Sequence, residues 1–380
     1  MSPPATPAFT NLLREKIARD GPLTFAGFMA LALYHPEHGY YAKQNRQVGR
    51  AGDFYTSVSV GPLFGKLLAR RFLNWWETSG SPEKWRIIEA GAHDGTLAAD
   101  ILSELLSLNQ TASAALEYVI DEPLPLLKAT QQRKLEPFAN VRFTDPDHPD
   151  RSVVPLPGIA FGNEVLDALP FHVIQWADGR WHECLVENSD DGFAWKISPD
   201  PLDESLQPQV APLGTGFPEG YRTEVRTCFQ DFFKPLLSQL SSGLLLFPDY
   251  GFATPDYYHP DRTSGTLRTF SKHQADENPL IDPGNIDITA HVDFTAAAKA
   301  ATALGCRPIS LKSQASFLTA LARDWLISLE GNPDASGLRQ FQSLTHPAQL
   351  GGKFHILELA WNDPAAPEIS AADRHRLAFE

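Results

Sequence analysis

The sequence lacks several features that would place it in a special class of protein. No apolar run approaches the 18 residues that a membrane-spanning helix requires, so we expect no transmembrane segment. The N-terminal stretch MSPPATPAFTNLLREKIARD has no basic flank followed by an apolar run, and acidic residues accompany its first basic ones. We therefore expect neither a secretory signal nor a transit peptide.

Cysteine is also scarce. The three cysteines, Cys184, Cys228 and Cys306, are far apart and odd in number, so they form neither a disulfide framework nor a zinc-binding spacing. A reducing compartment is the default for such a chain. We therefore predict a cytoplasmic location.

The chain has no excess of basic residues, and its formal net charge is -14. Nucleic-acid binding requires a basic surface, so this charge argues against a nucleic-acid partner. The negative charge can serve solubility alone, or it can attract a basic substrate. Both interpretations remain open at this point.

What the sequence does contain is an alternation of apolar strands and amphipathic helices. From residue 84 onward, helices AHDGTLAADILSELLSL and KATQQRKLEPF separate the expected strands WRIIEAG, LEYVI, VRF, GIAFGNE, GLLLFPDYG and FHILELA. Such alternation predicts an α/β fold of the Rossmann-like kind, with a mostly parallel sheet covered on both faces.

The remaining segments predict a domain plan. Residues 9–33 have helical spacing, and a second helix follows a turn-rich segment, so we expect an N-terminal helical cap over 1–80. The core would occupy 81–380. The segments 176–235 and 253–300 differ in composition from it, and we interpret them as insertions that build a lid or substrate lobe. Whether the chain forms a homodimer is left open.

Polar residues follow the expected strands at the points where ligands bind in parallel sheets. They are mostly carboxylic acids, and they occur at five successive strand ends: Glu89 with Gly91, Asp121 with Glu122, Asp145, then Asn163, Glu164 and Asp167, and finally Asp249 with Tyr250. This repetition predicts an active site along the carboxyl edge of the sheet.

The first strand end has the features of a cofactor turn. EAGAHDG places Gly91 and Gly95 between a strand and a helix, where backbone N–H groups can receive an anionic group. A full G-x-G-x-x-G is absent because His93 takes the middle position, so a plain turn is the alternative. Asp121 or Glu122, at the second strand end, could bind ribose hydroxyls or be solvated loop residues.

Eight ordered blocks of the sequence resemble the MidA-like methyltransferases, a family whose mitochondrial members assist assembly of respiratory complex I. The resemblance spans about residues 21–294 and extends to FHILELA. The blocks are LYHPEHGYY, GRAGDFYTS with LFG, IIEAGAHDGTL, EPLPLLKATQ, GNEVLDALP, DYG, TLRTF and DITAHVDF.

The resemblance implies a Rossmann-like enzyme that uses S-adenosyl-L-methionine, and an arginine of a partner protein as methyl acceptor. Carried over by position, Glu89, Gly91 and Gly95 would hold the amino-acid end of the cofactor, and Glu122 rather than Asp121 would bind the ribose. Gly52, Asp53 and Thr56 match a loop that closes near the cofactor, and Asp145 completes the predicted cofactor-binding set. The chain departs from the family at Val58, Ser59, Ala92 and His93, which leaves full activity in question.

The segment GNEVLDALPF is the predicted catalytic loop. A guanidinium acceptor must be oriented and must lose a proton, and carboxylates serve both tasks. We assign these tasks to Glu164 and Asp167, with Asn163 as a neutral positioning group. The alternative is structural: Asp167 caps a helix and Glu164 pairs with an arginine.

Further candidates lie at the end of the strand GLLLFPDYG and in the second predicted insertion. Tyr250, Arg268, His273 and His291 are the predicted substrate-binding residues. Asp249, His273, His291 and Asp293 could instead form the metal site of a hydrolase, although Asp293 or Thr295 could simply cap the helix FTAAAKAATAL. A third hypothesis is a non-catalytic assembly factor that binds the cofactor.

Overall fold

An eight-stranded sheet forms the centre of the computed structural model, which describes residues 7–42, 56–122, 124–144, 154–271, 274–276 and 278–379. Its order is β15-β16-β10-β5-β2-β3-β4, with β14 beside β10. The strands are β2 (Trp85–Ala90), β3 (Leu116–Asp121), β4 (Val141–Phe143), β5 (Leu156–Phe161), β10 (Leu240–Phe252), β14 (Val292–Asp293), β15 (Cys306–Ser313) and β16 (Phe354–Trp361). Five neighbouring strands, from β10 to β4, are parallel, and β16 runs antiparallel to both β10 and β15. The predicted α/β class with a mostly parallel sheet is confirmed.

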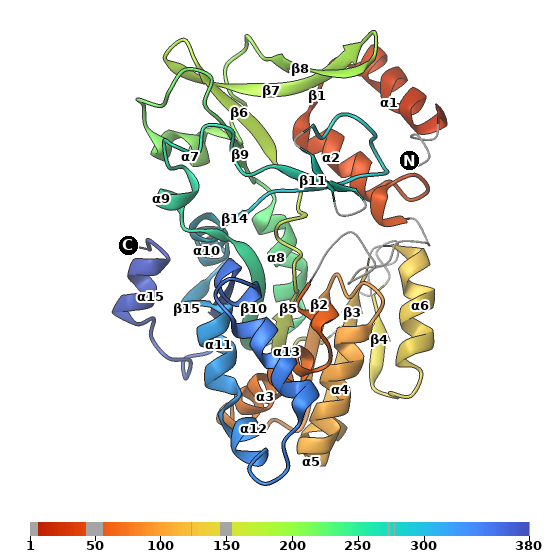
Figure 1. Cartoon of the computed structure of the whole chain (residues 1–380), viewed down its shortest axis with the longest axis vertical. Helices are drawn as coiled ribbons and strands as arrows, with labels where there is room; N and C mark the ends of the chain where they lie inside the picture. Colours follow the sequence, from red (N-terminus) through yellow and green to blue (C-terminus); the bar gives the residue numbers. More distant parts are fainter. Residues whose placement is uncertain are drawn as a thin grey trace.

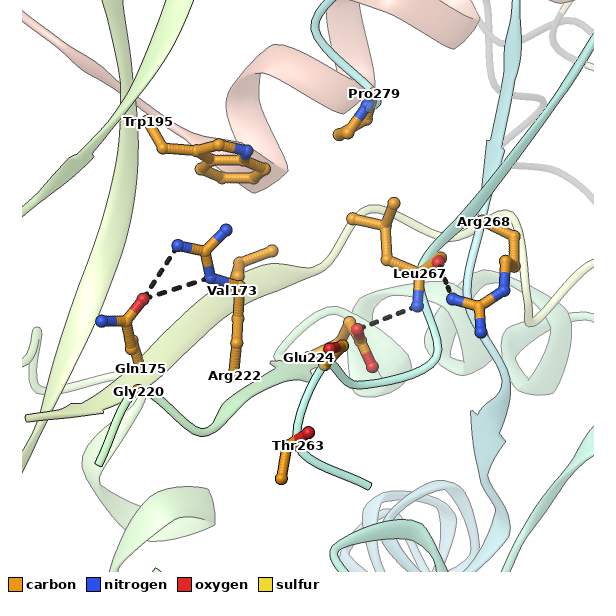
Figure 2. A pocket seen from close by; sticks show the side chains of 11 residues that line it. Val173, Gln175, Trp195, Gly220, Arg222, Glu224, Thr263, Leu267, Arg268 and Pro279 are labelled. Carbon is orange, nitrogen blue, oxygen red and sulfur yellow. Dashed lines mark hydrogen bonds between the residues drawn. The ribbon is translucent and has the colours of Figure 1, made fainter. Parts of the chain in front are cut away.

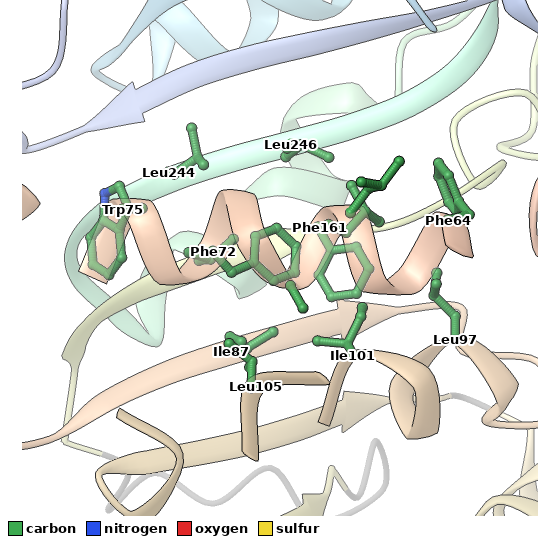
Figure 3. Close-up of a cluster of buried hydrophobic side chains, with 14 of the residues drawn as sticks. Phe64, Phe72, Trp75, Ile87, Leu97, Ile101, Leu105, Phe161, Leu244 and Leu246 are labelled. Atoms are coloured by element: carbon green, nitrogen blue, oxygen red, sulfur yellow. The ribbon is translucent and has the colours of Figure 1, made fainter. Parts of the chain in front are cut away.

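Helices cover both faces of this sheet, which is why its strands are apolar along their whole length. Successive side chains of a strand point to opposite faces, so Ile87 and Ile88 of β2 belong to two different hydrophobic clusters. Figure 3 shows the first cluster, where Phe72 of α3 and Ile101 of α4 pack near Ile87. Helices α8 and α10 pack on the opposite face.

Most of the longer helices lie around the central sheet, together with several short ones. They are α3 (Leu63–Thr78), α4 (Thr96–Leu108), α5 (Gln110–Ala114), α6 (Pro125–Leu135), α8 (Phe229–Ser238), α10 (Phe294–Ala303), α11 (Gln314–Leu321), α12 (Arg323–Ser328), α13 (Ala335–Thr345), α14 (Leu350–Lys353) and α15 (Ala371–Arg376).

A second, antiparallel sheet lies beyond one end of the central sheet, at the top of Figure 1. Its order is β1-β7-β6-β9, with β8 beside β7. Helices α1 and α2 pack against it through a third hydrophobic cluster, to which Phe28 and Val186 belong. The elements are α1 (Pro7–Asp20), β1 (Leu23–Thr24), α2 (Phe25–Tyr34), β6 (His172–Ala177), β7 (Arg180–Ser189), β8 (Gly192–Ile197) and β9 (Arg222–Val225).

A small three-stranded sheet and several short helices complete the structure. The sheet has the order β12-β11-β13 and is antiparallel. The elements are β11 (Arg268–Ser271), β12 (Gln274–Asp276), β13 (Asp287–Thr289), α7 (Gln207–Val210), α9 (Thr254–Tyr257), η1 (Tyr40–Ala42), η2 (Val58–Val60) and η3 (Ala211–Leu213).

Two expectations about secondary structure were wrong. The single helix over 9–33 is two helices, because Gly21 has φ +89° and Pro22 follows it, and β1 then pairs with β7. Strand β15 was not predicted at all: it contains Pro308, and its pairing with β16 shifts register next to that proline. Proline is tolerated there because β15 is an edge strand.

The predicted division into domains is not tested and stays a prediction. Helix α3, which falls within 1–80, packs on the central sheet, whereas α1 and α2 pack on the second sheet.

Within the part of the chain that the structure describes, no helix is both long and apolar enough to cross a membrane.

Candidate active site

The candidate site begins where the order of the central sheet reverses. Strand β2 has β3 on one side and β5 on the other, so the chain leaves β2 in one direction and later returns in the other. Ligands of open α/β sheets bind beyond the carboxyl ends of the strands at such a point. Glu89, Asp121 and the loop after β5 all lie at this edge.

The turn after β2 requires glycine at its first position. Gly91 has φ +66°, and a Cβ added there would lie 2.7 Å from Cγ1 of Val165. Gly91 is nevertheless exposed to solvent. His93, the departure from the usual turn, keeps 40% of its side chain exposed. The turn ends at Gly95, a left-handed residue that begins α4.

Two buried carboxyls flank this turn, and each is held by hydrogen bonds. Tyr118 donates its hydroxyl to Glu89 at 2.6 Å. Glu122 accepts from the Leu124 backbone N–H at 3.0 Å and from Nε2 of Gln131 at 3.1 Å. Gln131 also donates to the His93 carbonyl at 2.8 Å, so Glu122 and the glycine turn are held by one side chain.

Burial changes the acidity of these two groups. It raises the pKa of Glu89 to about 8 and the pKa of Glu122 to about 7, although the hydrogen bonds act in the opposite direction. Asp121 is only partly buried and accepts a hydrogen bond from the Thr144 hydroxyl at 2.7 Å. The second strand end therefore offers one enclosed and one more open carboxyl group.

The predicted catalytic loop lies beside a third carboxyl group, from Asp249. This residue is fully buried, and its Oδ2 accepts from the backbone N–H groups of Leu166 and Asp167 at 2.9 and 3.2 Å. Its Oδ1 accepts from the Tyr250 N–H at 2.9 Å. Asp249 therefore fixes the backbone of the loop rather than contributing a free ligand.

One carboxylate oxygen of Asp167 accepts hydrogen bonds from two hydroxyl groups, and the other oxygen has no partner among the described residues. Its Oδ2 accepts from the hydroxyls of Tyr250 and Thr289, the latter at 2.8 Å. Its Oδ1 is buried without a hydrogen-bond partner among the described residues, and so is Oδ1 of Asn163. These two oxygens are unused acceptors on the catalytic loop, and Oε1 of Gln131 is another on the cofactor side.

Glu164 adds a strained backbone to the same loop. It has φ +54°, which is uncommon for a residue with a side chain. Its N–H donates to the Pro248 carbonyl at 2.9 Å, and Nδ2 of Asn163 donates to its carboxyl group at 3.0 Å. Strain of this kind occurs where surrounding structure holds a functional side chain in place.

The three carboxyl groups of this acidic cluster (Glu164, Asp167 and Asp249) raise one another's proton affinity. Desolvation and the neighbouring Asp167 raise the pKa of Glu164 to about 8. Burial also raises the pKa values of Asp167 and Asp249. No lysine, arginine or histidine of the described segments forms an ion pair with any of the three.

Arg226 supports the loop and was not predicted. It is buried, and its guanidinium donates to the carbonyls of Asp167 at 2.6 Å, Leu169 at 3.2 Å, Ala290 at 2.8 Å and His291 at 2.7 Å. These bonds join the catalytic loop to the segment after β13. The sequence gives no signal for this role, because Arg226 lies in a predicted insertion and belongs to no motif.

The predicted substrate residues fall into different places. Tyr250 belongs to the Asp167 site. His291 stacks on Phe252 with ring centroids 5.1 Å apart, and burial lowers the pKa of His291 to about 4, so it is neutral. Arg268 lies on β11 and lines a separate pocket. His273 is outside the described residues.

The predicted closing loop is described only in part. Gly52, Asp53 and Asp145 lie outside the described residues. Thr56 is buried and forms a tight turn with Ser59, whose hydroxyl donates to the Thr56 carbonyl at 2.8 Å. The backbone of the adjacent Ser57 lies close enough to Glu164 to lower the pKa of its carboxyl group. This end of the loop therefore reaches the acidic cluster.

The described residues do not form the metal cluster that the hydrolase hypothesis requires. Asp293 caps α10 by accepting from the Ala296 N–H at 3.1 Å, as the capping alternative predicted, and it also accepts from Thr254. Asp249 is used by backbone N–H groups. Among the residues described, no three histidine, cysteine or acidic side chains could hold a metal ion together.

Comparison with known proteins identifies a family. Residues 67–311 match a family described as "Putative S-adenosyl-L-methionine-dependent methyltransferase". A Drosophila melanogaster protein named "Protein arginine methyltransferase NDUFAF7 homolog, mitochondrial" is 30% identical, covering 91% of this chain and 83% of its own length. The Rattus norvegicus protein arginine methyltransferase NDUFAF7 is 29% identical, covering 93% and 84%.

A solved structure agrees with these relatives. A crystal structure of a Burkholderia thailandensis protein bound to S-adenosyl-homocysteine superposes with a TM-score of 0.82 at 30% identity, covering 95% of this chain and 93% of that one. These likenesses favour the methyltransferase over the hydrolase and the non-catalytic binder.

The comparisons also correct the predicted location. Relatives from several animals carry the word mitochondrial in their names. The cytoplasmic location inferred from the unpaired cysteines is therefore wrong, because free cysteines indicate a reducing environment without distinguishing one such compartment from another.

Proposed function

Because this chain belongs to that family of S-adenosyl-L-methionine-dependent methyltransferases, we propose that it methylates an arginine of a protein substrate. The names of the relatives support this acceptor. The acidic cluster gives a chemical reason for it. A homodimer and the lack of a nucleic-acid partner stay predictions.

The residues beside β2 fit the cofactor. The exposed backbone at Gly91 leaves no room for a Cβ, and backbone N–H groups at the start of α4 suit a carboxylate. Gly91, Gly95 and Glu89 would hold its amino-acid end, and Glu122 its ribose, with Asp121 beside it. When bound, S-adenosylmethionine supplies an electrophilic methyl group on a sulfonium. The protein's own task is then placement of the acceptor.

One observation carries the choice of arginine: Glu164 and Asp167 on one loop, with Asp249 of β10 beside them, form no ion pair among the described residues. The nearby Arg226 donates to backbone carbonyls, and Oδ1 of Asp167 and of Asn163 has no hydrogen-bond partner in the described part of the chain. A guanidinium offers five N–H donors in a planar fork and a permanent positive charge. It would satisfy the free oxygens of Asn163 and Asp167 and relieve the repulsion among the carboxylates.

The proton that leaves the acceptor nitrogen needs a base. Burial raises the pKa values of Glu164 and Asp167, and a raised pKa makes each group a stronger base once a bound cation has favoured its ionised form. Arg226 and Asp249 would keep the loop in position during the reaction. Asn163, whose amide does not titrate, would orient the guanidinium.

The test is identification of the methylated atom. The full chain is incubated with methyl-labelled S-adenosylmethionine and the proteome of cells that lack this protein, and labelled peptides are sequenced by mass spectrometry. We expect label on guanidinium nitrogens of few proteins. Label on lysine, on carboxyl groups or on small molecules would reject arginine as the acceptor, and failure to bind S-adenosyl-homocysteine would reject the cofactor site.

A further inference from the structure

A second pocket lies between the antiparallel sheet and the segment that contains β11. Its volume is about 280 Å³. Val173 and Gln175 of β6 and Arg222 and Glu224 of β9 line it from one face of the sheet, as the strand register pairs Val173 with Glu224 and Gln175 with Arg222. Figure 2 shows that Leu267, Arg268 and Pro279 line it from the other side.

Arg222 is held in position on one wall. Its Nη2 and Nε donate to Oε1 of Gln175 at 2.8 and 3.3 Å. Its guanidinium carbon also lies 5.1 Å from the centre of the Trp195 ring. Figure 2 shows the guanidinium beside that ring. A guanidinium fixed in this way loses little conformational freedom when it binds a carboxylate.

The charged groups of this pocket that can bind a ligand are positive. Glu224 is buried, and it accepts from the Thr266 and Leu267 backbone N–H groups and from the Tyr257 hydroxyl at 2.9 to 3.0 Å. Arg222 and Arg268, by contrast, are partly exposed, and neither forms an ion pair with a carboxylate of the described segments. Two arginines therefore lack an acidic partner, although the chain has a net charge of -14.

This arginine pocket (Gln175, Trp195, Arg222 and Arg268) is a near neighbour of the acidic cluster. Arg268 pairs with Thr289 across β11 and β13. The Thr289 hydroxyl donates to Asp167 at 2.8 Å. Adjacent strands lie about 4.8 Å apart, so Thr289 connects the strand of Arg268 with the side chain of Asp167.

We propose that the arginine pocket binds an aspartate or glutamate side chain of the protein substrate, close in sequence to the arginine that enters the acidic cluster. The proposal rests on the proposed function for the identity of that substrate. The two sites have opposite charge, so together they would select a segment with an arginine and an acidic residue at a fixed spacing. A carboxylate fits because the bonds of Arg222 to Gln175 and of Arg268 to the Leu267 carbonyl use only part of the N–H donors of each guanidinium, and guanidinium donors form charge-assisted hydrogen bonds with carboxylates.

Direct binding tests the pocket without methyl transfer. The probe is a fluorescein-labelled peptide of glycine, serine and two glutamates, without arginine, and its partner has lysines in place of the glutamates. At low salt, where screening is weak, we expect the glutamate peptide alone to raise the anisotropy. The double variant R222Q/R268Q should weaken its binding about tenfold or more, since charge-assisted hydrogen bonds are lost.

Matched variants separate the pocket from general charge and from folding. R323Q/R339Q removes two exposed arginines of α12 and α13 and should leave binding unchanged. R222E/R268E should reverse the preference and bind the lysine peptide, which an unfolded variant would not do. Equal binding by wild type and R222Q/R268Q, or competition by free glutarate at the same concentration as the peptide, would overturn a peptide site.

A second arm uses arginine peptides with one glutamate moved along the sequence. We expect methylation to peak at one spacing in the wild type and to lose that peak in R222Q/R268Q. If arginines are methylated regardless of glutamate position, the pocket proposal fails and the proposed function stands. If no arginine is methylated but the glutamate peptide binds through Arg222 and Arg268, the proposed function fails and the carboxylate site stands.

Discussion

The two halves of the active site handle their carboxyl groups differently. Beside β2 and β3, Glu89 and Glu122 each have their own donors, from Tyr118 in one case and from Leu124 and Gln131 in the other. After β5, Glu164 and Asp167 share one loop with Asp249 of β10 beside it, and Oδ1 of Asp167 has no partner among the described residues. The carboxyl groups of the cofactor half are thus each held by donors of their own, whereas in our proposal a cation completes the acceptor half.

The largest expected effect is on methyl transfer, in Asp167→Asn. The asparagine keeps an oxygen for the Tyr250 and Thr289 hydroxyls but loses the negative charge and the ability to take a proton. We expect turnover to fall about 100-fold to 10,000-fold, the contribution of a general base. Affinity for S-adenosyl-homocysteine, measured by calorimetry, should stay unchanged because the cofactor half is intact.

A matched control is Asp231→Asn, which removes an exposed carboxylate that pairs with Lys234 on the same helix. It should leave both turnover and cofactor affinity as they are. A parallel loss of turnover and cofactor affinity in Asp167→Asn would instead assign Asp167 to the structure of the loop, and the contrast between the two halves would disappear.

The next effect concerns the cofactor half, in Gly91→Ala. A residue other than glycine at φ +66° costs about 1–3 kcal/mol, and the new methyl group overlaps Val165. We expect cofactor affinity to fall at least about tenfold, with stability reduced in thermal unfolding. Adding Val165→Ala should restore part of the loss by relieving the overlap.

Gly80→Ala gives the cost of the backbone conformation alone. Gly80 has φ +84° with nothing within 4 Å of an added Cβ, and it follows α3. We expect a loss of stability of about 1–2 kcal/mol with cofactor affinity unchanged. If Gly80→Ala and Gly91→Ala weaken cofactor binding equally, the fit between Gly91 and Val165 has no functional meaning.

The sequence predicts the cofactor half better than the acceptor half, for a physical reason. The strands and helices around Gly91 follow local periodicity, and Gln131 reaches Glu122 across 9 positions within one turn and helix. The acceptor half depends on distant contacts: Thr289 reaches Asp167 across 122 positions, and Arg226 across 59. Local patterns locate Glu164 and Asp167 at a strand end, but they do not identify the residues that hold them.

A similar limit explains the errors in the fold. Strand β1 has two residues and exists because β7, far along the chain, pairs with it. Asp249 follows an apolar run and was considered as a metal ligand, yet its oxygens accept backbone N–H groups that only the folded loop brings near. Periodicity records which face of an element is buried, and it contains no information about such partners.

The pH dependence of stability should be a smaller effect than those of the variants above. It should again distinguish the cofactor half from the acceptor half. Glu164 has a pKa of about 8 in the folded chain and 4.5 as its ordinary value, so the folded state holds a proton that the unfolded state releases over this range. Stability therefore falls as the pH rises from about 4.5 to about 8. We expect a lower urea midpoint at pH 8 than at pH 5.5, which corresponds to a free energy of unfolding lower by on the order of 1–2 kcal/mol per carboxyl group.

Glu164→Gln and Glu122→Gln each remove one such proton, so each should flatten the pH dependence of the urea midpoint. Free arginine should raise the stability of the wild type at pH 8, because a cation favours the ionised cluster. It should do so less in Glu164→Gln, and as much as in the wild type in Glu122→Gln. If free arginine raises the stability of Glu164→Gln as much as that of the wild type, the acceptor half does not contain the proposed cation site.

The smallest expected effect is that of Tyr118→Phe, which removes the donor to Glu89 and leaves the acidic cluster unchanged. The lost hydrogen bond should lower stability by about 1 kcal/mol, and the pKa of Glu89 should rise further because this bond lowers it. Tyr221→Phe, whose hydroxyl makes only a 3.4 Å contact with the His259 carbonyl, is the control. Urea unfolding of Tyr118→Phe, Glu89→Gln and the double variant then measures the coupling between the two side chains. A coupling near zero would mean that Tyr118 does not hold Glu89 in the protein without its ligand. The two halves would then differ only in charge.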